Sequence, residues 1–173
     1  MLCDTKGIIC AGRKENMNPA KENALKYLLP SGNGSLAEAL KGADAFIGVS
    51  GPDTVSEEMV RSMNKNSIVF AMSNPVPEIM PDKAKKAGAA VVGTGRSDME
   101  NQINNLLAFP GIFRGVFDVR AGKITEKMKF AASMAIAGYI PENKLCPEYI
   151  IPSPLDKQVG KKVAEKVSAA WRE

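Results

Sequence analysis

Small and amide side chains that follow three apolar runs are the residues of this chain best suited to chemistry. Ser50 and Gly51 follow the first run, Asn74 follows the second, and Asn104-Asn105 lies beyond the third. A glycine lets a flat ligand approach the backbone, and neutral amides hold a carboxylate or a carboxamide without adding a charge. Each amide also has a structural alternative, because Asn74 precedes a proline in a turn and Asn104-Asn105 can decorate a helix.

The acidic residue Asp4 is a different kind of candidate. In dinucleotide-binding folds an acidic residue at the end of the second strand accepts hydrogen bonds from ribose hydroxyls, and Leu2-Cys3-Asp4 is typical of a strand end. The alternative is a cap on the turn before Lys6-Gly7. The strand and helix units that follow favour the ribose role. By contrast, Gly93-Thr94-Gly95 lacks the glycine and helix spacing of a phosphate loop and predicts a tight turn.

The three apolar runs, 45–49, 68–72 and 89–93, must position these loops. Helical stretches separate them, so the order strand, helix, strand, helix, strand requires a parallel sheet with crossover helices. The runs are continuous, which is typical of strands buried on both faces. Because ligands of such sheets bind beyond the carboxyl ends of the strands, the loops at 50–52, 73–75 and 93–98 are the candidate site.

Capping residues and prolines mark the helices. We expect helix starts at Asn18-Pro19, at Ser35 before 36–40, at a capping box of Thr54 and Glu57, at Pro81 and at Thr125. A short helix over 101–107 is expected to be broken by Phe109-Pro110-Gly111. A final helix is predicted from about 156 to 171.

Composition limits the class of protein. Hydrophobic residues make up 45% and charged residues 24% of the 173 residues, which predicts one globular domain over 1–173. The net charge of +4 comes from lysines spread along helices, so nucleic acid is not an expected partner. No run has the length of a membrane span. There is no histidine, which removes histidine acid-base chemistry, and three unpaired cysteines indicate reduced thiols and a cytoplasmic location.

Five stretches together resemble one known family. They are Asp4–Ile9 with Gly12-Arg13, Gly42–Ser50, Ser73–Ile79, Thr94–Asp98, and Asn101–Asn105 with Phe109–Gly115. In amino-acid sequence and in order along the chain, they are similar to the carboxyl-terminal, nucleotide-binding half of bacterial malic enzymes. The resemblance covers nearly the whole chain.

The resemblance implies oxidative decarboxylation of malate to pyruvate, with hydride transfer to NAD or NADP and with Mg or Mn as the metal. It implies an α/β fold, an incomplete Rossmann-like parallel sheet flanked by helices that lacks the first strand and its glycine-rich turn. In the family the catalytic tyrosine, the lysine base and the metal ligands precede the region where this chain starts, so no catalytic or metal-binding residue is expected here and the chain alone is predicted to be inactive. By position, the residues expected at the cofactor are Asp4, Ser50, Gly51, Asn74 and Asn104, and those at the substrate carboxylate are Asn74 and Asn105.

Two matters stay open at this level. Asp4 would repel the extra phosphate of NADP, whereas nearby Lys6 or Arg13 could offset that repulsion. The alternative function is a non-catalytic dinucleotide-binding or oligomerisation module. Under either hypothesis a sheet without a central strand exposes backbone groups and apolar surface, so we expect a homo-oligomer.

Overall fold

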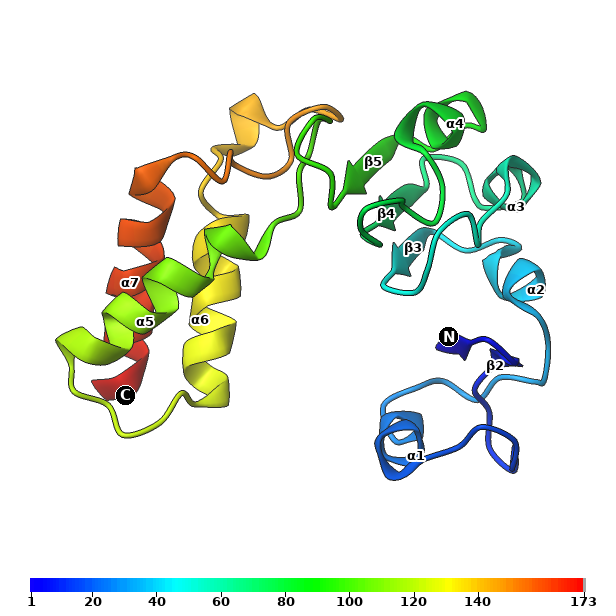
Figure 1. Cartoon of the computed structure of the whole chain (residues 1–173), viewed down its shortest axis with the longest axis horizontal. Helices are drawn as coiled ribbons and strands as arrows, with labels where there is room; N and C mark the ends of the chain where they lie inside the picture. The colour runs from blue at the N-terminus through cyan, green and yellow to red at the C-terminus, as the bar shows by residue number, and fades with distance from the viewer. Residues whose placement is uncertain (173) are drawn as a thin grey trace. The chain divides into compact units, whose positions relative to one another are not determined.

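The computed structural model describes residues 1–172, which divide into two compact units, Met1–Val91 and the part of the chain from Val92 onward (Figure 1). The first unit contains short strands and helices, and the second is mainly helical. A single domain over 1–173 stays a prediction, because compactness of contacts alone does not define a folding unit.

The N-terminal unit begins with an antiparallel ribbon. Strand β1 (Cys3–Asp4) pairs with β2 (Gly7–Ile8) around a tight turn. Helix α1 (Pro19–Leu25) starts at Asn18, whose side chain accepts a hydrogen bond from the Lys21 backbone N–H, and α2 (Leu36–Leu40) starts at a capping box made by Ser35 and Glu38. Both predicted helix starts are confirmed.

The predicted order of strands and helices is also confirmed. Strands β3 (Ala45–Gly48), β4 (Ile68–Ala71) and β5 (Val91–Thr94) form a three-stranded sheet in that order, and β3 pairs in parallel with β4, from Ala45 opposite Ile68 to Gly48 opposite Ala71. Helices α3 (Glu57–Arg61) and α4 (Pro81–Lys86) lie between the strands in sequence. The third strand begins two residues later than its apolar run. The chain is therefore an α/β protein.

Two expectations for this unit are wrong. Strand β3 alternates between exposed and buried residues instead of being buried on both faces, and it lines an open groove. Helix α3 starts at Ser56, not at Thr54, and the Ser56 hydroxyl accepts the hydrogen bond from the Met59 N–H. The Val55 N–H donates to the Glu78 carbonyl at 2.9 Å, which keeps the chain extended past Thr54.

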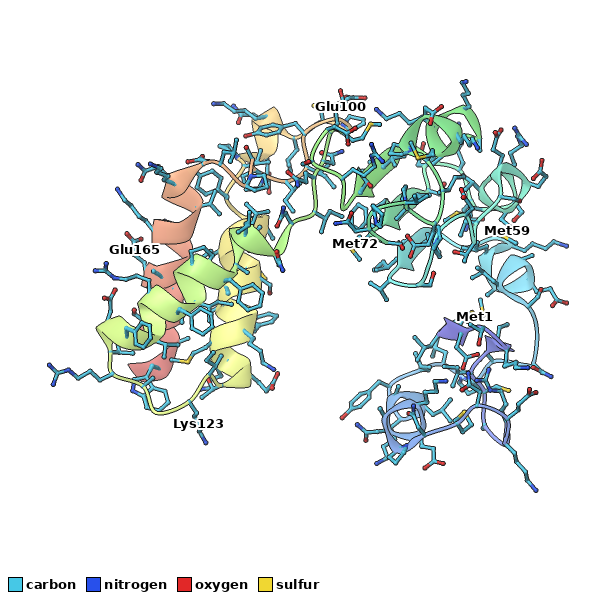
Figure 2. The ribbon with its side chains drawn as sticks, in the orientation of Figure 1. Met1, Met59, Met72, Glu100, Lys123 and Glu165 are labelled. Atoms are coloured by element: carbon cyan, nitrogen blue, oxygen red, sulfur yellow. The ribbon has the colours of Figure 1, made fainter. Side chains whose placement is uncertain are left out.

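The C-terminal unit consists of a short 3-10 turn, η1 (Asn105–Leu107), helices α5 (Phe109–Asp118), α6 (Glu126–Ala137) and α7 (Lys157–Arg172), and a second turn, η2 (Glu142–Lys144). Side chains of the three helices, drawn in Figure 2, form one apolar cluster that includes Met128, Val163 and Val167. The predicted helix start at Thr125 and the predicted final helix are confirmed.

The predicted break at 109–111 is wrong, because these residues begin α5. Pro110 occupies the first turn, where its missing N–H costs nothing. Gly111 allows α7 to pack closely, since a Cβ built there would lie 2.6 Å from the Val163 Cβ. The predicted helix over 101–107 is reduced to η1, because Asn101 has a positive φ of 50° and leaves helical geometry.

Candidate functional site

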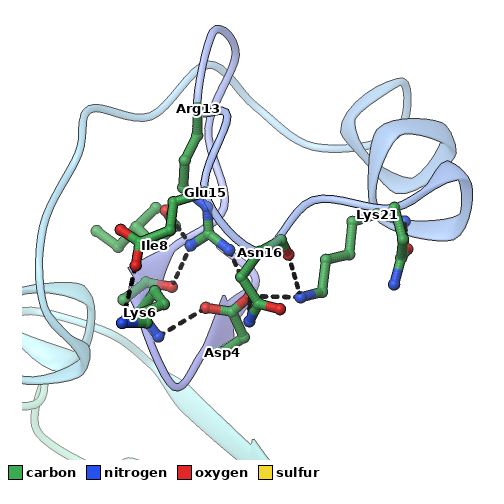
Figure 3. A network of polar contacts seen from close by, with 9 residues as sticks. Asp4, Lys6, Ile8, Arg13, Glu15, Asn16 and Lys21 are labelled. Carbon is green, nitrogen blue, oxygen red and sulfur yellow. Dashed lines mark hydrogen bonds and ion pairs between the residues drawn. The ribbon is translucent and has the colours of Figure 1, made fainter.

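Asp4 lies at the centre of a cationic cluster at the start of the chain (Figure 3). One carboxylate oxygen accepts hydrogen bonds from Arg13, from Lys21 Nζ at 2.6 Å and from Asn16 Nδ2 at 3.0 Å, and the other accepts from the Lys6 N–H at 2.8 Å. The Arg13 guanidinium also donates to the carbonyls of Gly7 and Ile8, which anchors it against the ribbon.

These contacts decide the charge of the Asp4 side chain. The hydrogen bond from Arg13, joined by that from Lys21, holds the pKa of Asp4 well below its usual range and outweighs the opposing effect of desolvation. Asp4 is therefore an ionised acceptor at neutral pH. Two cations meet one carboxylate here, so the cluster is not acidic overall, and a ribose hydroxyl would have to share Asp4 with these partners.

Ser50 is the second residue beyond β3 and is hydrogen-bonded to a residue that the sequence analysis did not single out. Glu78 is fully buried, and its Oε1 accepts from the Ser50 N–H at 2.7 Å and from the Ser50 Oγ at 3.2 Å. Its Oε2 accepts from the Ser73 N–H at 3.0 Å. The loops after β3 and β4 are thus joined through one carboxylate.

Gly51 and Asn74 are the neighbours of these two serines along the chain. Gly51 is half-buried, its carbonyl accepts from the Thr54 hydroxyl at 3.2 Å, and Asn74 is exposed with a cis peptide bond to Pro75. The structure therefore brings the predicted residues Ser50, Gly51 and Asn74 to the carboxyl ends of two paired parallel strands, where ligands of such sheets bind.

Asn104 and Asn105 lie in the C-terminal unit. The Asn104 side chain accepts from the Leu106 N–H at 2.9 Å and so caps η1, and Asn105 is the exposed first residue of that turn. This cap is the structural alternative for Asn104, and a ligand contact by the same side chain stays a prediction. Binding of one ligand by Asn74 and Asn105 together stays a prediction.

An open groove of about 1320 Å³ lies within the N-terminal unit, between the β1–β2 ribbon, α2 and β3. Asp4 and Ser50 both line it, and apolar residues such as Phe46 and Ile47 form much of its wall. Its volume exceeds the roughly 300–1000 Å³ of pockets for drug-sized ligands. The groove is therefore larger than a pocket for a drug-sized ligand, and Asp4, with its hydrogen-bond partners, lies on its wall.

The described residues do not fit a divalent metal. Within 1–172 no group of three or more His, Cys, Asp or Glu side chains is arranged to hold an ion. Among the helices of the described part, none has the length and apolar character needed to span a bilayer.

Two polar residues with extensive contacts were missed by the sequence analysis. Glu78 is one. Asn101 is the other, and its buried amide donates to the carbonyls of Val92 at 2.9 Å and Pro147 at 2.7 Å and accepts from the Ile150 N–H at 3.0 Å. For Glu78 the available signal was a charged residue inside the otherwise apolar stretch Val76–Met80. For Asn101 nothing local indicates partners 46 and 49 residues away.

Comparison with known proteins gives a consistent result. The family model "Malic enzyme, NAD binding domain" matches residues 1–171. The "Bifunctional malic/malolactic enzyme" of Bacillus subtilis is 52% identical over 174 residues, which are 100% of this chain and 42% of that protein. The "NADP-dependent malic enzyme" of Rhizobium meliloti is 43% identical over 188 residues, 100% of this chain and 24% of that protein.

Solved structures agree with these sequence matches. The NAD-dependent malic enzyme from Thermotoga maritima superimposes with a TM-score of 0.88 at 42% identity, covering 94% of this chain and 43% of the other. The malic enzyme from Pyrococcus horikoshii gives a TM-score of 0.74 at 51% identity, covering 80% and 32%. The chain thus spans less than half the length of each of these relatives.

Proposed function

Because this chain belongs to the malic enzyme NAD-binding domain family, we propose that the protein carrying it converts malate to pyruvate by oxidative decarboxylation. NAD or NADP accepts the hydride when bound. The observation that carries the proposal is the position of Ser50, Gly51 and Asn74 at the ends of paired parallel strands, where ligands of such sheets bind.

We assign binding roles to this chain's own residues. Asp4 accepts hydrogen bonds from the adenosine ribose, Ser50 and Gly51 allow the cofactor to approach the backbone, and Asn74 and Asn104 hold the cofactor by amide hydrogen bonds. Asn74 and Asn105 bind the substrate carboxylate. The choice between NAD and NADP rests on the Asp4 cluster, where Arg13 and Lys21 offset the repulsion of a ribose phosphate.

No step of the reaction is assigned to a metal-binding residue of this chain, since residues 1–172 offer no metal site. Mg or Mn is proposed as a cofactor of the whole protein. The proton transfers are likewise left to the whole protein, and the role of the described residues is to bind and orient the dinucleotide and malate.

We propose further that β3 lies inside a larger Rossmann-like sheet in that protein, with the first strand and its glycine-rich turn filling the groove. The support is the exposed apolar surface of the β3 segment, where Ile47 is 66% and Val49 79% exposed. β3 is also an edge strand of the described sheet, and the unpaired N–H and C=O groups of an edge strand form a surface on which another strand can pair.

A homo-oligomer and a cytoplasmic location complete the proposal. Phe109, Phe113 and Phe117 are exposed at four-residue spacing along α5, and the first two rings stack at 6.0 Å. Exposed aromatic rows are typical of protein interfaces, so light scattering of the gene product should give a multiple of the monomer mass, and a monomer would contradict it. The free cysteines among the described residues support a reducing compartment.

The activity is tested on the intact gene product that carries this chain. With malate, Mn²⁺ and either dinucleotide, it should form pyruvate and reduced dinucleotide in equal amounts. Dinucleotide binding without malate oxidation would instead support the non-catalytic binding module.

A further inference from the structure

Glu78 is a buried carboxylate that the proposed binding roles do not use. Its side chain is shielded from solvent, and within residues 1–172 no ion pair with Lys or Arg involves it. Its three partners are two backbone N–H groups and one hydroxyl. Acidic side chains are almost never fully buried unless paired, so this arrangement needs a reason.

The carboxylate bridges two loops that are distant in sequence. Oε1 accepts a hydrogen bond from the N–H of Ser50, 28 residues earlier in the chain, and Oε2 accepts one from the N–H of Ser73, five residues earlier. Each oxygen therefore holds the second residue beyond one strand, and the distance between the loops is fixed by the rigid width of one carboxylate.

Gly48 in β3 leaves room for the Glu78 side chain. A Cβ built on Gly48 would lie 2.6 Å from the Glu78 Cδ, 2.8 Å from its Oε1 and 2.8 Å from the Phe46 Cε1, so any larger residue at this place in β3 would force these side chains to shift. The main chain adds two bonds, from the Asp53 N–H to the Pro77 carbonyl at 3.1 Å and from the Val55 N–H to the Glu78 carbonyl at 2.9 Å. The loop after β3 is consequently held at both ends by residues 77 and 78.

We propose that Glu78 is a positioning residue: its carboxylate clamps the backbone at Ser50 and Ser73 and so fixes the binding geometry of Gly51 and Asn74. This inference rests on the proposed function for the ligands that those neighbours meet. Burying a carboxyl group costs desolvation free energy, so it is a poor way to stabilise a core. It is an effective way to hold binding groups in a preorganised geometry.

The decisive variant is Glu78→Gln in the intact gene product. Glutamine keeps the size of the side chain but replaces one acceptor oxygen with an NH₂ donor, which then faces an N–H or O–H donor. The matched control is Glu165→Gln, the same change at an exposed position of α7 labelled in Figure 2. Gly48→Ala is the second variant, because its Cβ would displace the carboxylate, together with the Phe46 ring, without altering the chemistry of Glu78.

Both clamp variants should raise the KM for dinucleotide and for malate by about 10- to 100-fold, as expected when the displaced Gly51 and Asn74 each lose a hydrogen bond to a ligand, and kcat should fall less. Hydrogen exchange should speed up at the Ser50 and Ser73 amides. The control should match wild type. Should Glu78→Gln not accumulate as a folded protein, Glu78→Asp, which withdraws both oxygens by one methylene, is measured in its place.

Unchanged KM values and unchanged amide exchange in a folded variant would overturn the clamp, and so would a lowered melting temperature with wild-type KM values. The proposed function fails separately, if the wild type does not oxidise malate. In that case the dissociation constant for dinucleotide and the exchange at Ser50 and Ser73 still decide the role of Glu78.

Discussion

The replacement Asn101→Ala is predicted to destabilise the C-terminal unit. The Asn101 side chain is 6% exposed and makes three hydrogen bonds, two donated to the carbonyls of Val92 and Pro147 and one accepted from the Ile150 N–H. Each such bond contributes about 1 kcal/mol net, so the loss should be roughly 3 kcal/mol in the free energy of unfolding. Asn101→Asp should cost more, since a carboxylate would face two carbonyl oxygens.

The assay is urea unfolding followed by the fluorescence of Trp171, the single tryptophan of this 173-residue chain, which lies on α7 of the same unit. Asn23→Ala, at an exposed position of α1, is the matched control and should change stability by no more than about 0.5 kcal/mol. An Asn101→Ala variant whose free energy of unfolding lies within about 0.5 kcal/mol of wild type would refute the reasoning, because the hydrogen bonds that join β5 to residues 147–150 through Asn101 would then contribute nothing.

Three further predictions concern packing, charge and the sheet edge. Gly111→Ala should lower the free energy of unfolding by about 1–3 kcal/mol, because its Cβ would overpack against Val163. A urea midpoint of unfolding equal to that of wild type would contradict the close α5–α7 contact. Because the fold lowers the pKa of Asp4, the ionised side chain stabilises the fold above its ordinary pKa near 3.8, and this stabilisation is lost as the pH falls through the lowered pKa. Asp4→Asn should therefore lower the melting temperature at pH 7, and the difference from wild type should close in acid. A difference in melting temperature that does not depend on pH would refute the ion-pair account. Ile47→Lys should change the free energy of unfolding of the 173-residue chain by no more than about 0.5 kcal/mol, because the Ile47 side chain is exposed there. It should destabilise the intact gene product, in which the first strand is proposed to fill the groove. Equal effects in both proteins would contradict the larger sheet.

Local sequence signals were sufficient for much of the fold. Ser35, Pro81 and Thr125 each begin a helix where predicted, because caps and first-turn prolines act through neighbours only a few residues away. The start of α3 could not be decided in that way. Thr54 and Ser56 are both competent caps, and the bond from the Val55 N–H to the Glu78 carbonyl selects Ser56.

Ambiguous residues account for the error at 109–111. Proline and glycine are as typical of a helix start as of a helix break, and the choice depends on whether another helix packs there. Gly111 lies against α7, more than 40 residues later in the chain, and no local pattern carries that information.

The candidate site was likewise predicted where local signals were sufficient and missed where contacts depend on the tertiary fold. Ser50 and Asn74 were predicted at the ends of parallel strands, because periodicity and turn residues locate strand ends. The partners of Asp4 and the buried position of Glu78 were not predicted, since Arg13, Lys21 and Ser50 reach these carboxylates only through the tertiary fold.

The proposal that the loops beyond β3 and β4 bind the ligands of a malic enzyme is tested most directly by kcat/KM for malate in the Asn74→Ala variant of the intact gene product. Loss of a hydrogen bond to the substrate carboxylate should lower kcat/KM by about 10- to 150-fold, with the melting temperature unchanged because Asn74 is exposed. A wild-type kcat/KM together with a lowered melting temperature would contradict the account and make Asn74 a structural turn residue.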